Sequence, residues 1–289
     1  MTGPDRVGAP PADSPDVRRF YDRYVEAHVP YHRCPQGWQA AVLRALPYWS
    51  YREWRFWRRA VPAGCRLLDL GSARGREIFR RRAAWAIGID LASAALVECA
   101  EHYDGALLGS LAALPFADES FDCVVSSHVL GHTPFAIKPA VHAEIERVLR
   151  PGGRTVHVIE VDGAHPLVEL SKQDPELYRR RIIDPDGHVG LDAPRAALDR
   201  FCDAGLEYVE ATPWENGPIH PRLAVKWFDN EHRDRDPRFA ELVRCSRDLL
   251  ASPARLALAE VALGCWGAWF GPRRGLDEAL FLAAVFRKP

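Results

Sequence analysis

The stretch Arg66-Leu67-Leu68-Asp69-Leu70-Gly71-Ser72-Ala73-Arg74-Gly75-Arg76 decides the fold of this chain. Its apolar first half predicts a buried strand that ends beside an acidic residue, and its glycines predict a turn from that strand into a helix. A dinucleotide fingerprint, G-x-G-x-x-G, would need glycine in place of Ala73 and Arg76, so the stretch does not support a pyrophosphate site. It contains D-x-G-x-x-x-G instead, which indicates a cofactor-binding turn of another kind.

A second apolar run, from Trp85 to Ile89, ends at Asp90, which follows Asp69 by 21 residues. Because ligands of parallel sheets bind outside the carboxyl ends of the strands, both acids are expected to line one crevice. One carboxylate there can bind a ribose diol, and the other suits a partly cationic ligand. S-adenosylmethionine, with its ammonium and sulfonium groups, fits these acids better than a phosphate bridge, which prefers backbone N–H groups.

Three further segments follow the glycine loop in a fixed order: GSLAALPF at 109–116, SFDCVVSSHVLGH at 120–132 and EIERVLRPGG at 144–153. With these segments the chain resembles the class I S-adenosylmethionine-dependent methyltransferases that act on small molecules, quinones or sugars. The resemblance covers residues 62–162, roughly a third of the chain. Each segment alone is weak evidence for this family, but the glycine loop and the three segments together, in this order and spacing, are strong evidence.

The resemblance implies roles for individual residues. Gly71 and Gly75 would let the backbone approach the cofactor, Asp69 would hold the methionine amine, and Asp90 would bind the ribose. Leu91 would pack on the adenine. The residues expected to contact S-adenosylmethionine are Asp69, Gly71, Ser72, Gly75, Asp90, Leu91, Ser110, Leu111, Ser127 and Tyr21. The chain departs from the family pattern at Ala73, where the middle glycine is missing, at Ser110, which replaces an acid, and at Gly131, which replaces a glutamate.

Alternating strand and helix patterns predict an α/β fold, a doubly wound, seven-stranded and mostly parallel Rossmann-like sheet. Strands are expected near 66–70, 85–90, 106–109, 122–126, 154–161, 206–212 and 279–286. Helices are expected near 75–82, 92–102, 136–149 and 192–201. The resemblance implies that the last strand inserts antiparallel beside the fifth.

The predicted core does not account for the whole chain. We expect a disordered leader at 1–15, a helical N-terminal cap at 16–60, a methyltransferase core at 61–212 with 276–289, and a helical insertion at 213–275 that caps the substrate. The insertion is too long for a structureless loop, and helices are predicted there at 238–251 and 254–270. The second is apolar nearly all round, which indicates burial against a cap, a dimer partner or a lipid-like ligand, with burial in a cap the simplest of the three.

The composition argues against several classes of binding partner and functional site. With 38 basic and 39 acidic residues, the chain has a formal net charge of −1 and no basic field that would attract nucleic acid or an anionic membrane. The seven cysteines contain no C-x-x-C pair, so we expect reduced thiols in the cytoplasm and no metal centre. No signal peptide or membrane span is predicted. The expected partner is a small-molecule acceptor, and a homodimer stays open.

Methyl transfer is an in-line displacement that requires alignment of the acceptor and exclusion of water, so few catalytic residues are expected. A hydroxyl acceptor benefits from a general base, for which histidine is the usual choice. Positions after the fourth and fifth strands favour His132, His165 and Glu160 as the catalytic residues, with His128 and Asp162 close by. Further acceptor contacts are expected in the insertion, at Trp214, Glu215, Asn216 and His220.

The most direct hypothesis is a methyltransferase that acts on an oxygen or nitrogen of a small molecule, such as a natural product or a sugar. A second hypothesis keeps the cofactor but replaces methyl transfer by cyclisation of the cofactor's own side chain. A third is an RNA-modifying or noncatalytic relative. For the RNA-modifying form, Arg52, Arg55 and Arg59 on one face of a helix at 48–60 would bind nucleic acid.

Overall fold

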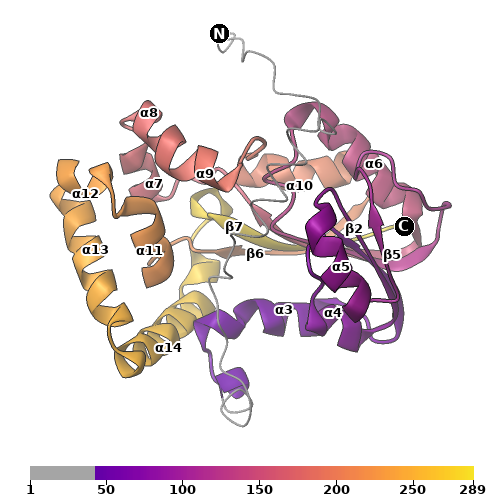
Figure 1. The fold of residues 1–289 in the computed structure, drawn as a ribbon, viewed down its shortest axis with the longest axis horizontal. Coiled ribbons are helices and arrows are strands. Elements are labelled where there is room, and N and C mark those ends of the chain that lie inside the picture. Colours follow the sequence, from indigo (N-terminus) through magenta and orange to yellow (C-terminus); the bar gives the residue numbers. More distant parts are fainter. Residues whose placement is uncertain (1–42) are drawn as a thin grey trace.

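The computed structural model describes residues 43–289, which enclose a seven-stranded sheet of order β3-β2-β1-β4-β5-β7-β6 (Figure 1). Tyr21, the leader 1–15 and the first part of the expected cap, 16–42, lie outside the described residues. The strands are β1 (Cys65–Leu70), β2 (Ala83–Asp90), β3 (Gly105–Leu108), β4 (Phe121–Ser127), β5 (Leu149–Glu160), β6 (Glu207–Trp214) and β7 (Phe281–Arg287).

The pairing of the strands confirms the predicted α/β fold. Strands β1 to β5 pair in parallel, whereas β7 pairs antiparallel with both β5 and β6. The last strand therefore inserts beside the fifth, as the resemblance implied. The parallel part of the sheet brings the carboxyl ends of β1, β2, β4 and β5 to one edge, where ligands of such sheets bind.

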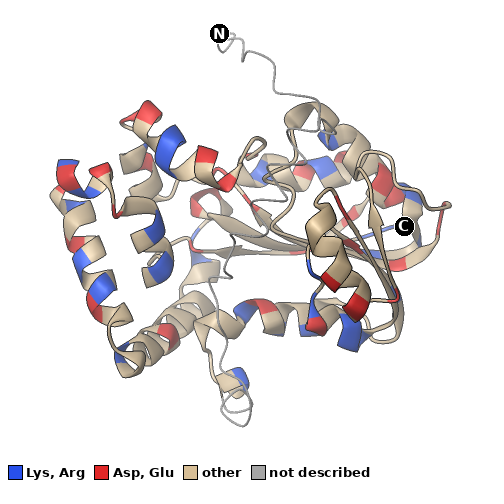
Figure 2. Ribbon diagram, in the orientation of Figure 1, with Lys and Arg blue, Asp and Glu red and all other residues tan. Residues whose placement is uncertain are grey.

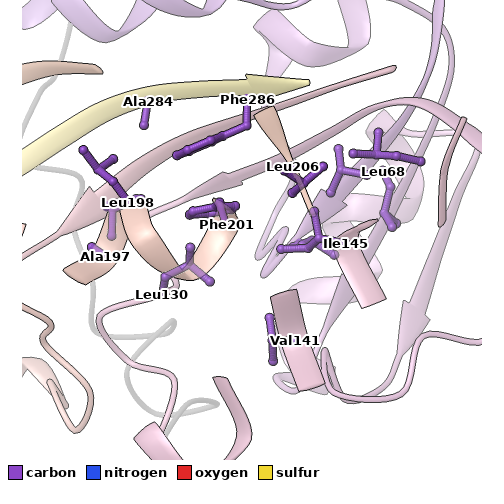
Figure 3. Close-up of a cluster of buried hydrophobic side chains, with 14 of the residues drawn as sticks. Leu68, Leu130, Val141, Ile145, Ala197, Leu198, Phe201, Leu206, Ala284 and Phe286 are labelled. Atoms are coloured by element: carbon purple, nitrogen blue, oxygen red, sulfur yellow. The ribbon is translucent and has the colours of Figure 1, made fainter. Parts of the chain in front are cut away.

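Helices cover both faces of the sheet, which explains why both Leu67 and Leu68, on opposite faces of β1, are apolar and buried. Leu67 is fully buried in a cluster with residues of α3 (Arg52–Ala60), α4 (Glu77–Arg82) and α5 (Ser93–His102). Leu68 and Leu70 face the opposite side, where they join residues of α6 (Lys138–Val148) and α10 (Pro194–Asp203) in a second cluster (Figure 3). The predicted helices of the core are confirmed to within about two residues at most ends.

A helical excursion between β5 and β6 has no counterpart among the predicted elements. It contains α7 (Pro166–Ser171), α8 (Pro175–Tyr178), the π-helical turn η3 (Arg179–Ile183) and α9 (Asp184–Asp186). These elements are short, so they lack the periodic apolar pattern by which a longer helix is recognised. The excursion packs through Val168 and Ile182 against the insertion that follows β6.

That insertion contains α11 (Pro221–Phe228), α12 (Glu231–Arg235), α13 (Pro237–Leu250) and α14 (Pro253–Trp269) (Figure 1). The two predicted helices correspond to α13 and α14. Asp236 and Ser252 cap them with side-chain oxygens that accept backbone N–H groups, and a proline occupies the first helical position in both. Helices α11 and α13 share an apolar cluster with α7 that includes Trp227 and Phe239.

Helix α14 is less buried than its apolar sequence predicts. Only Glu260 and Gly264 are fully buried on it, while Leu258, Trp269 and Phe270 are 72%, 67% and 57% exposed. The described residues therefore cover only part of this helix, and its burial against a dimer partner or a lipid-like ligand stays a prediction. Among the described residues no single helix has the length and apolar character to cross a membrane, and the bent pair Pro237–Leu250 with Pro253–Arg273 meets that test only when both parts are taken together.

The buried side of α14 supports the chain that enters α3. Glu260 accepts hydrogen bonds from the backbone N–H of Ser50 at 2.7 Å and from the Ser50 hydroxyl at 2.6 Å. A Cβ atom at Gly264 would overlap the carbonyl oxygen of Pro47. The N-terminal cap and the late insertion are therefore held together at a backbone-to-backbone contact.

We predict that Gly264→Ala lowers the free energy of unfolding by about 1–3 kcal/mol, because the added methyl group displaces backbone atoms. Gly267→Ala, one turn further along α14, is the matched control. Its added Cβ would meet only the ring of Trp49 at 3.1 Å, a side chain that can shift. Denaturant titration of both variants measures the difference, and equal stability of the two would contradict the packing described here.

Candidate active site

The glycine loop after β1 forms a tight cradle. Gly71 and Gly75 have φ angles of 62° and 74°, and the N–H of Gly75 donates to the carbonyl of Ser72 at 2.8 Å. A Cβ at Gly71 would overlap the side chain of Val129. Only glycine fits there without movement, so the backbone of the loop passes directly over the segment that follows β4.

The two predicted acids lie at the ends of neighbouring strands, since β1 pairs with β2 in a register that places Asp69 opposite Gly88. The carboxylate of Asp90 accepts the N–H groups of Ala73 and Ala92, each at 2.8 Å. The loop and the second strand are thus fixed to each other through Asp90. The structure therefore brings both acids to the edge of the sheet that carries the glycine loop, where the cofactor crevice was expected.

Asp69 is buried, and burial raises the pKa of its carboxyl to about 7. The hydrogen bond from the Tyr103 hydroxyl, 2.8 Å from its Oδ2 atom, and the charge of Arg76 oppose this rise, while the charge of Asp90 adds to it. The Tyr103 hydroxyl also accepts the backbone N–H of Arg76 at 2.8 Å. Tyr103 was not predicted as a site residue, because nothing in its local sequence points to the loop.

The remaining predicted cofactor residues that the structure describes lie at the ends of strands β1 to β4 or in the segments that follow them. The Ser72 hydroxyl is buried and accepts from the Cys99 thiol at 3.4 Å. Leu91, Ser110 and Leu111 are partly exposed in the segments that follow β2 and β3. The Ser127 hydroxyl is buried and has no hydrogen-bond partner within the described chain, so its donor is free for a ligand. These features fit an adenosyl ligand that carries an ammonium group.

His128 follows β4 and forms the centre of a partly buried ion network. Its Nδ1 atom donates to Glu160 at 2.9 Å, and its Nε2 atom donates to Glu53 of α3 at 3.0 Å. Burial alone would lower the pKa of His128, but the two carboxylates raise it to about 10. His128 is therefore an imidazolium with both N–H groups engaged, and it cannot accept a proton from a substrate. Glu53 also receives the guanidinium of Arg76 at 3.2 Å.

On the other side of Glu160 lie two further imidazoles. The Nε2 atom of His132 is 3.8 Å from Glu160 Oε1, and the ring of His188 lies 4.8 Å from that of His132. Burial would raise the pKa of Glu160, but the charge of His128 lowers it to about 2, so Glu160 is ionised. Burial, assisted by the charge of His132, lowers the pKa of His188 to about 4, so that ring is neutral at pH 7.

A pocket opens beside these side chains. Glu160 and His188 form part of its wall, and apolar and aromatic residues form most of the rest. Those residues include Tyr178, Ile182, Leu191, Trp227, Leu280 and Phe281. The wall thus combines residues of the excursion after β5 with residues of α11, so both inserted segments shape the pocket.

His165 does not join this cluster. It is the N-cap of α7, where its Nδ1 atom accepts the N–H of Leu167 at 3.2 Å and its Nε2 atom donates to the carbonyl of Gly217 at 2.7 Å. Both ring nitrogens are therefore engaged in holding backbone. Among the predicted catalytic residues, the structure brings together His132 and Glu160 and gives His165 a supporting position.

The candidate contacts in the insertion are also engaged within the protein. His220 caps α11 and donates to Glu260 at 2.9 Å. Asn216 donates to the carbonyl of Gly271 at 2.8 Å, and Glu215 pairs with Arg52 at 3.0 Å. The ring of Trp214 lies 5.0 Å from the guanidinium of Arg52, so Trp214 and Glu215 join the insertion to the N-terminal cap. Asn216 and His220 make their contacts within the insertion, and none of the four residues is part of the pocket wall.

The basic face of α3 is occupied in the same way. Arg52 is buried against Glu215, Arg55 donates to the carbonyls of Leu46 and Tyr48, and Arg59 pairs with Glu210. Basic and acidic residues are interspersed along α3, α4 and α13 (Figure 2). Arg52 is therefore not available to nucleic acid, whereas the side chain of Arg59 is 60% exposed, so these contacts do not decide the RNA hypothesis.

Comparison with known proteins agrees with the fold and with the residues found at the edge of the sheet. Residues 68–157 match a family model described as a methyltransferase domain. A demethylmenaquinone methyltransferase of Lactococcus lactis is 38% identical over 154 residues, 48% of this chain and 59% of that protein. One of Mycobacterium sp. is 36% identical over 177 residues, 55% of this chain and 74% of that protein. The chain thus spans less than two thirds of the Lactococcus protein.

Among solved structures, the phosphoethanolamine N-methyltransferase 2 of Haemonchus contortus in complex with S-adenosyl-L-methionine matches with a TM-score of 0.52. The match covers 95% of this chain and 59% of that one, at 18% identity. This degree of likeness supports the fold and says nothing about the acceptor.

The loop contains one residue in an unfavourable conformation. Ala73 has a φ angle of 44°, in the left-handed region. We predict that Ala73→Gly leaves the free energy of unfolding unchanged or raises it by up to about 1 kcal/mol, because relief of the left-handed strain offsets the entropy cost of glycine. As a control, Ala143→Gly on the exposed face of α6 is expected to cost about 1 kcal/mol. Thermal unfolding of both variants measures the contrast; a loss in Ala73→Gly as large as in the control would argue against this conformation.

Proposed function

Because this chain belongs to the class I S-adenosylmethionine-dependent methyltransferases, we propose that it transfers a methyl group to an oxygen or nitrogen of a small organic acceptor. One observation supports this above all others. A single edge of the sheet carries the glycine loop with its two acids on one side and, on the other, an aromatic pocket that ends at Glu160 and His188.

The residues of the crevice fit the cofactor. The loop turns tightly through Gly71 and Gly75, Asp69 would pair with the ammonium group of the cofactor, and Asp90 would accept its ribose hydroxyls. The free hydroxyl of Ser127 adds a donor or acceptor in the same crevice. When bound, S-adenosylmethionine supplies a methyl group on a sulfonium, which is a good leaving group.

The pocket favours an acceptor with an apolar or aromatic body and one polar end. Tyr178, Trp227 and Phe281 provide flat apolar surface, whereas Glu160 and His188 supply polar atoms at one place in the wall. Pockets of this composition bind small organic ligands and orient them through a few polar contacts. The cavity has a volume of about 30 Å³, so its wall would have to move apart to admit an acceptor. A hydroxyl or amine at the polar end of the acceptor would meet Glu160 and the neighbouring His132.

The surrounding charges limit which residue can handle the acceptor's proton. His128 is protonated and serves to keep Glu160 ionised and in place. His165 uses both ring nitrogens to hold backbone. His132 and Glu160 remain as the side chains through which a proton would leave the acceptor, and most of the rate enhancement would come from alignment and from exclusion of water.

The raised pKa of Asp69 gives the cofactor interaction a distinct pH dependence. In the free protein Asp69 titrates near pH 7, and a bound ammonium group would favour its ionised form, so binding releases a proton. We expect the affinity for S-adenosylhomocysteine to rise about tenfold between pH 5.5 and pH 7, below the range in which an α-amino group itself titrates. Calorimetry in buffers of different ionisation enthalpy measures both the affinity and the number of protons released on binding.

The matched control is Asp69→Asn, which cannot ionise and should bind more weakly at pH 7 with little change across this range. A wild-type affinity that stays constant from pH 5.5 to pH 7 would exclude Asp69 as the partner of the ammonium group.

The reaction itself is tested by its products. Incubation of the protein with S-adenosylmethionine and a panel of aromatic alcohols and amines should yield S-adenosylhomocysteine and a methylated acceptor. Glu160→Gln should lower kcat by about 10²-fold or more while S-adenosylhomocysteine affinity stays within about twofold. Glu101→Gln, on the exposed surface of α5, is the control and should keep full activity. Formation of methylthioadenosine would instead indicate attack within the cofactor side chain and would contradict methyl transfer.

A further inference from the structure

Two imidazoles and a carboxylate from three separate segments converge beside the acceptor pocket. His132 follows β4, Glu160 ends β5, and His188 lies just beyond α9. One nitrogen or oxygen atom from each side chain lies within 4.8 Å of the corresponding atoms of the other two. Two histidines and one carboxylate form a set of ligands typical of catalytic metal sites that leave a coordination position open.

The carboxylate of Glu160 has one oxygen atom with a hydrogen-bond partner and one without. Its Oε1 atom accepts the hydrogen bond from His128. Its Oε2 atom is buried and has no hydrogen-bond partner within residues 43–289. A buried carboxylate oxygen without a partner is costly, so this atom indicates a ligand that belongs at this place. Glu160 also forms part of the pocket wall, where that ligand would meet the acceptor.

The backbone around His188 holds the two imidazoles in place. The Nδ1 atom of His132 donates to the carbonyl of Gly187 at 3.3 Å, and Gly187 adopts a left-handed conformation with φ 69°. This glycine directly precedes His188, so one peptide unit helps to position both rings. Histidines that bind metals usually donate their other N–H group to a backbone carbonyl or a carboxylate, as His132 does here.

We propose that His132, Glu160 and His188 bind one divalent transition-metal ion, Zn²⁺ or an ion of similar chemistry, with a free coordination position that faces the acceptor pocket. Bonds of about 2.0–2.2 Å from a tetrahedral ion place ligand atoms roughly 3.3–3.6 Å apart. The observed separations, up to 4.8 Å, require side-chain adjustments of about one ångström. No metal was expected from the sequence, because the three ligands show no spacing pattern and the cysteines take no part.

The catalytic use of the ion rests on the proposed function. A hydroxyl group of the acceptor bound at the free position would lose its proton to solvent near neutral pH, because the cation stabilises the alkoxide. The acceptor oxygen would then form a bond to the methyl carbon as the carbon–sulfur bond breaks and its electron pair stays on sulfur. The products are a methyl ether, S-adenosylhomocysteine and one proton. His132 would then act as a ligand and would not need to act as a base.

The experiment measures metal binding directly on the full chain without an affinity tag. We expect the chain to bind one equivalent of Zn²⁺. We also expect it to bind one equivalent of Co²⁺, with a visible absorption spectrum that indicates a low coordination number of the cobalt ion. Glu160→Gln and His188→Ala should each weaken Zn²⁺ binding more than about 100-fold. Replacement of a residue that only hydrogen-bonds to a metal ligand weakens binding less than this. His102→Ala, which removes an exposed histidine of α5, should leave it unchanged.

Calorimetry with S-adenosylhomocysteine shows whether each variant is folded, since the cofactor crevice lies outside the ligand set. Failure of the wild-type chain to bind Zn²⁺ or Co²⁺, or binding that both ligand variants leave intact, would overturn the metal site even if methyl transfer is observed. Stoichiometric binding that the ligand variants abolish, without methyl transfer to any acceptor, would support the site and count against the proposed function alone.

Discussion

The bridge that the imidazolium of His128, 30% exposed, makes between two carboxylates is the interaction on which the organisation of this site depends. His128 bridges Glu160 at the end of β5 and Glu53 on α3, so it links the sheet to a helix that precedes the first strand. Of the three charges Glu160 is buried and the other two are partly buried, and a buried charge is stable only when it has a partner. The network therefore fixes the position of α3 relative to the sheet and keeps Glu160 ionised.

This network separates two functions along one edge of the sheet. On one side Arg76 joins Glu53 to the loop that follows β1, where Asp69, Asp90 and the glycines form the cofactor crevice. On the other side Glu160 faces His132, His188 and the pocket. Glu53 and Glu160 bind the same histidine, His128. One connected set of charges therefore links the proposed cofactor site, through Glu53, to the proposed acceptor site, through Glu160. The helices that follow β5 and β6 close the pocket and add its aromatic surface.

The sequence predicted what depends on local pattern. Apolar runs such as 67–70 and the glycines after them identify strands and turns over a few residues, and the crevice acids follow from where those strands end. Glu53, Tyr103 and His188 were missed, because each reaches the site from a distant segment without a spacing pattern. His165 and His220 were placed among the candidate site residues, yet each precedes a proline and caps a helix. That dipeptide was a local signal for their capping role.

The central claim is that the glycine crevice and the aromatic pocket meet at one point along this edge of the sheet. A crystal structure of the complex with S-adenosylhomocysteine tests it most directly. The account predicts ribose hydroxyls on Asp90, the amino group at Asp69, and the sulfur directed toward the space beside Glu160 and His188. A ligand bound elsewhere, or a sulfur atom that faces away from that space, would contradict it.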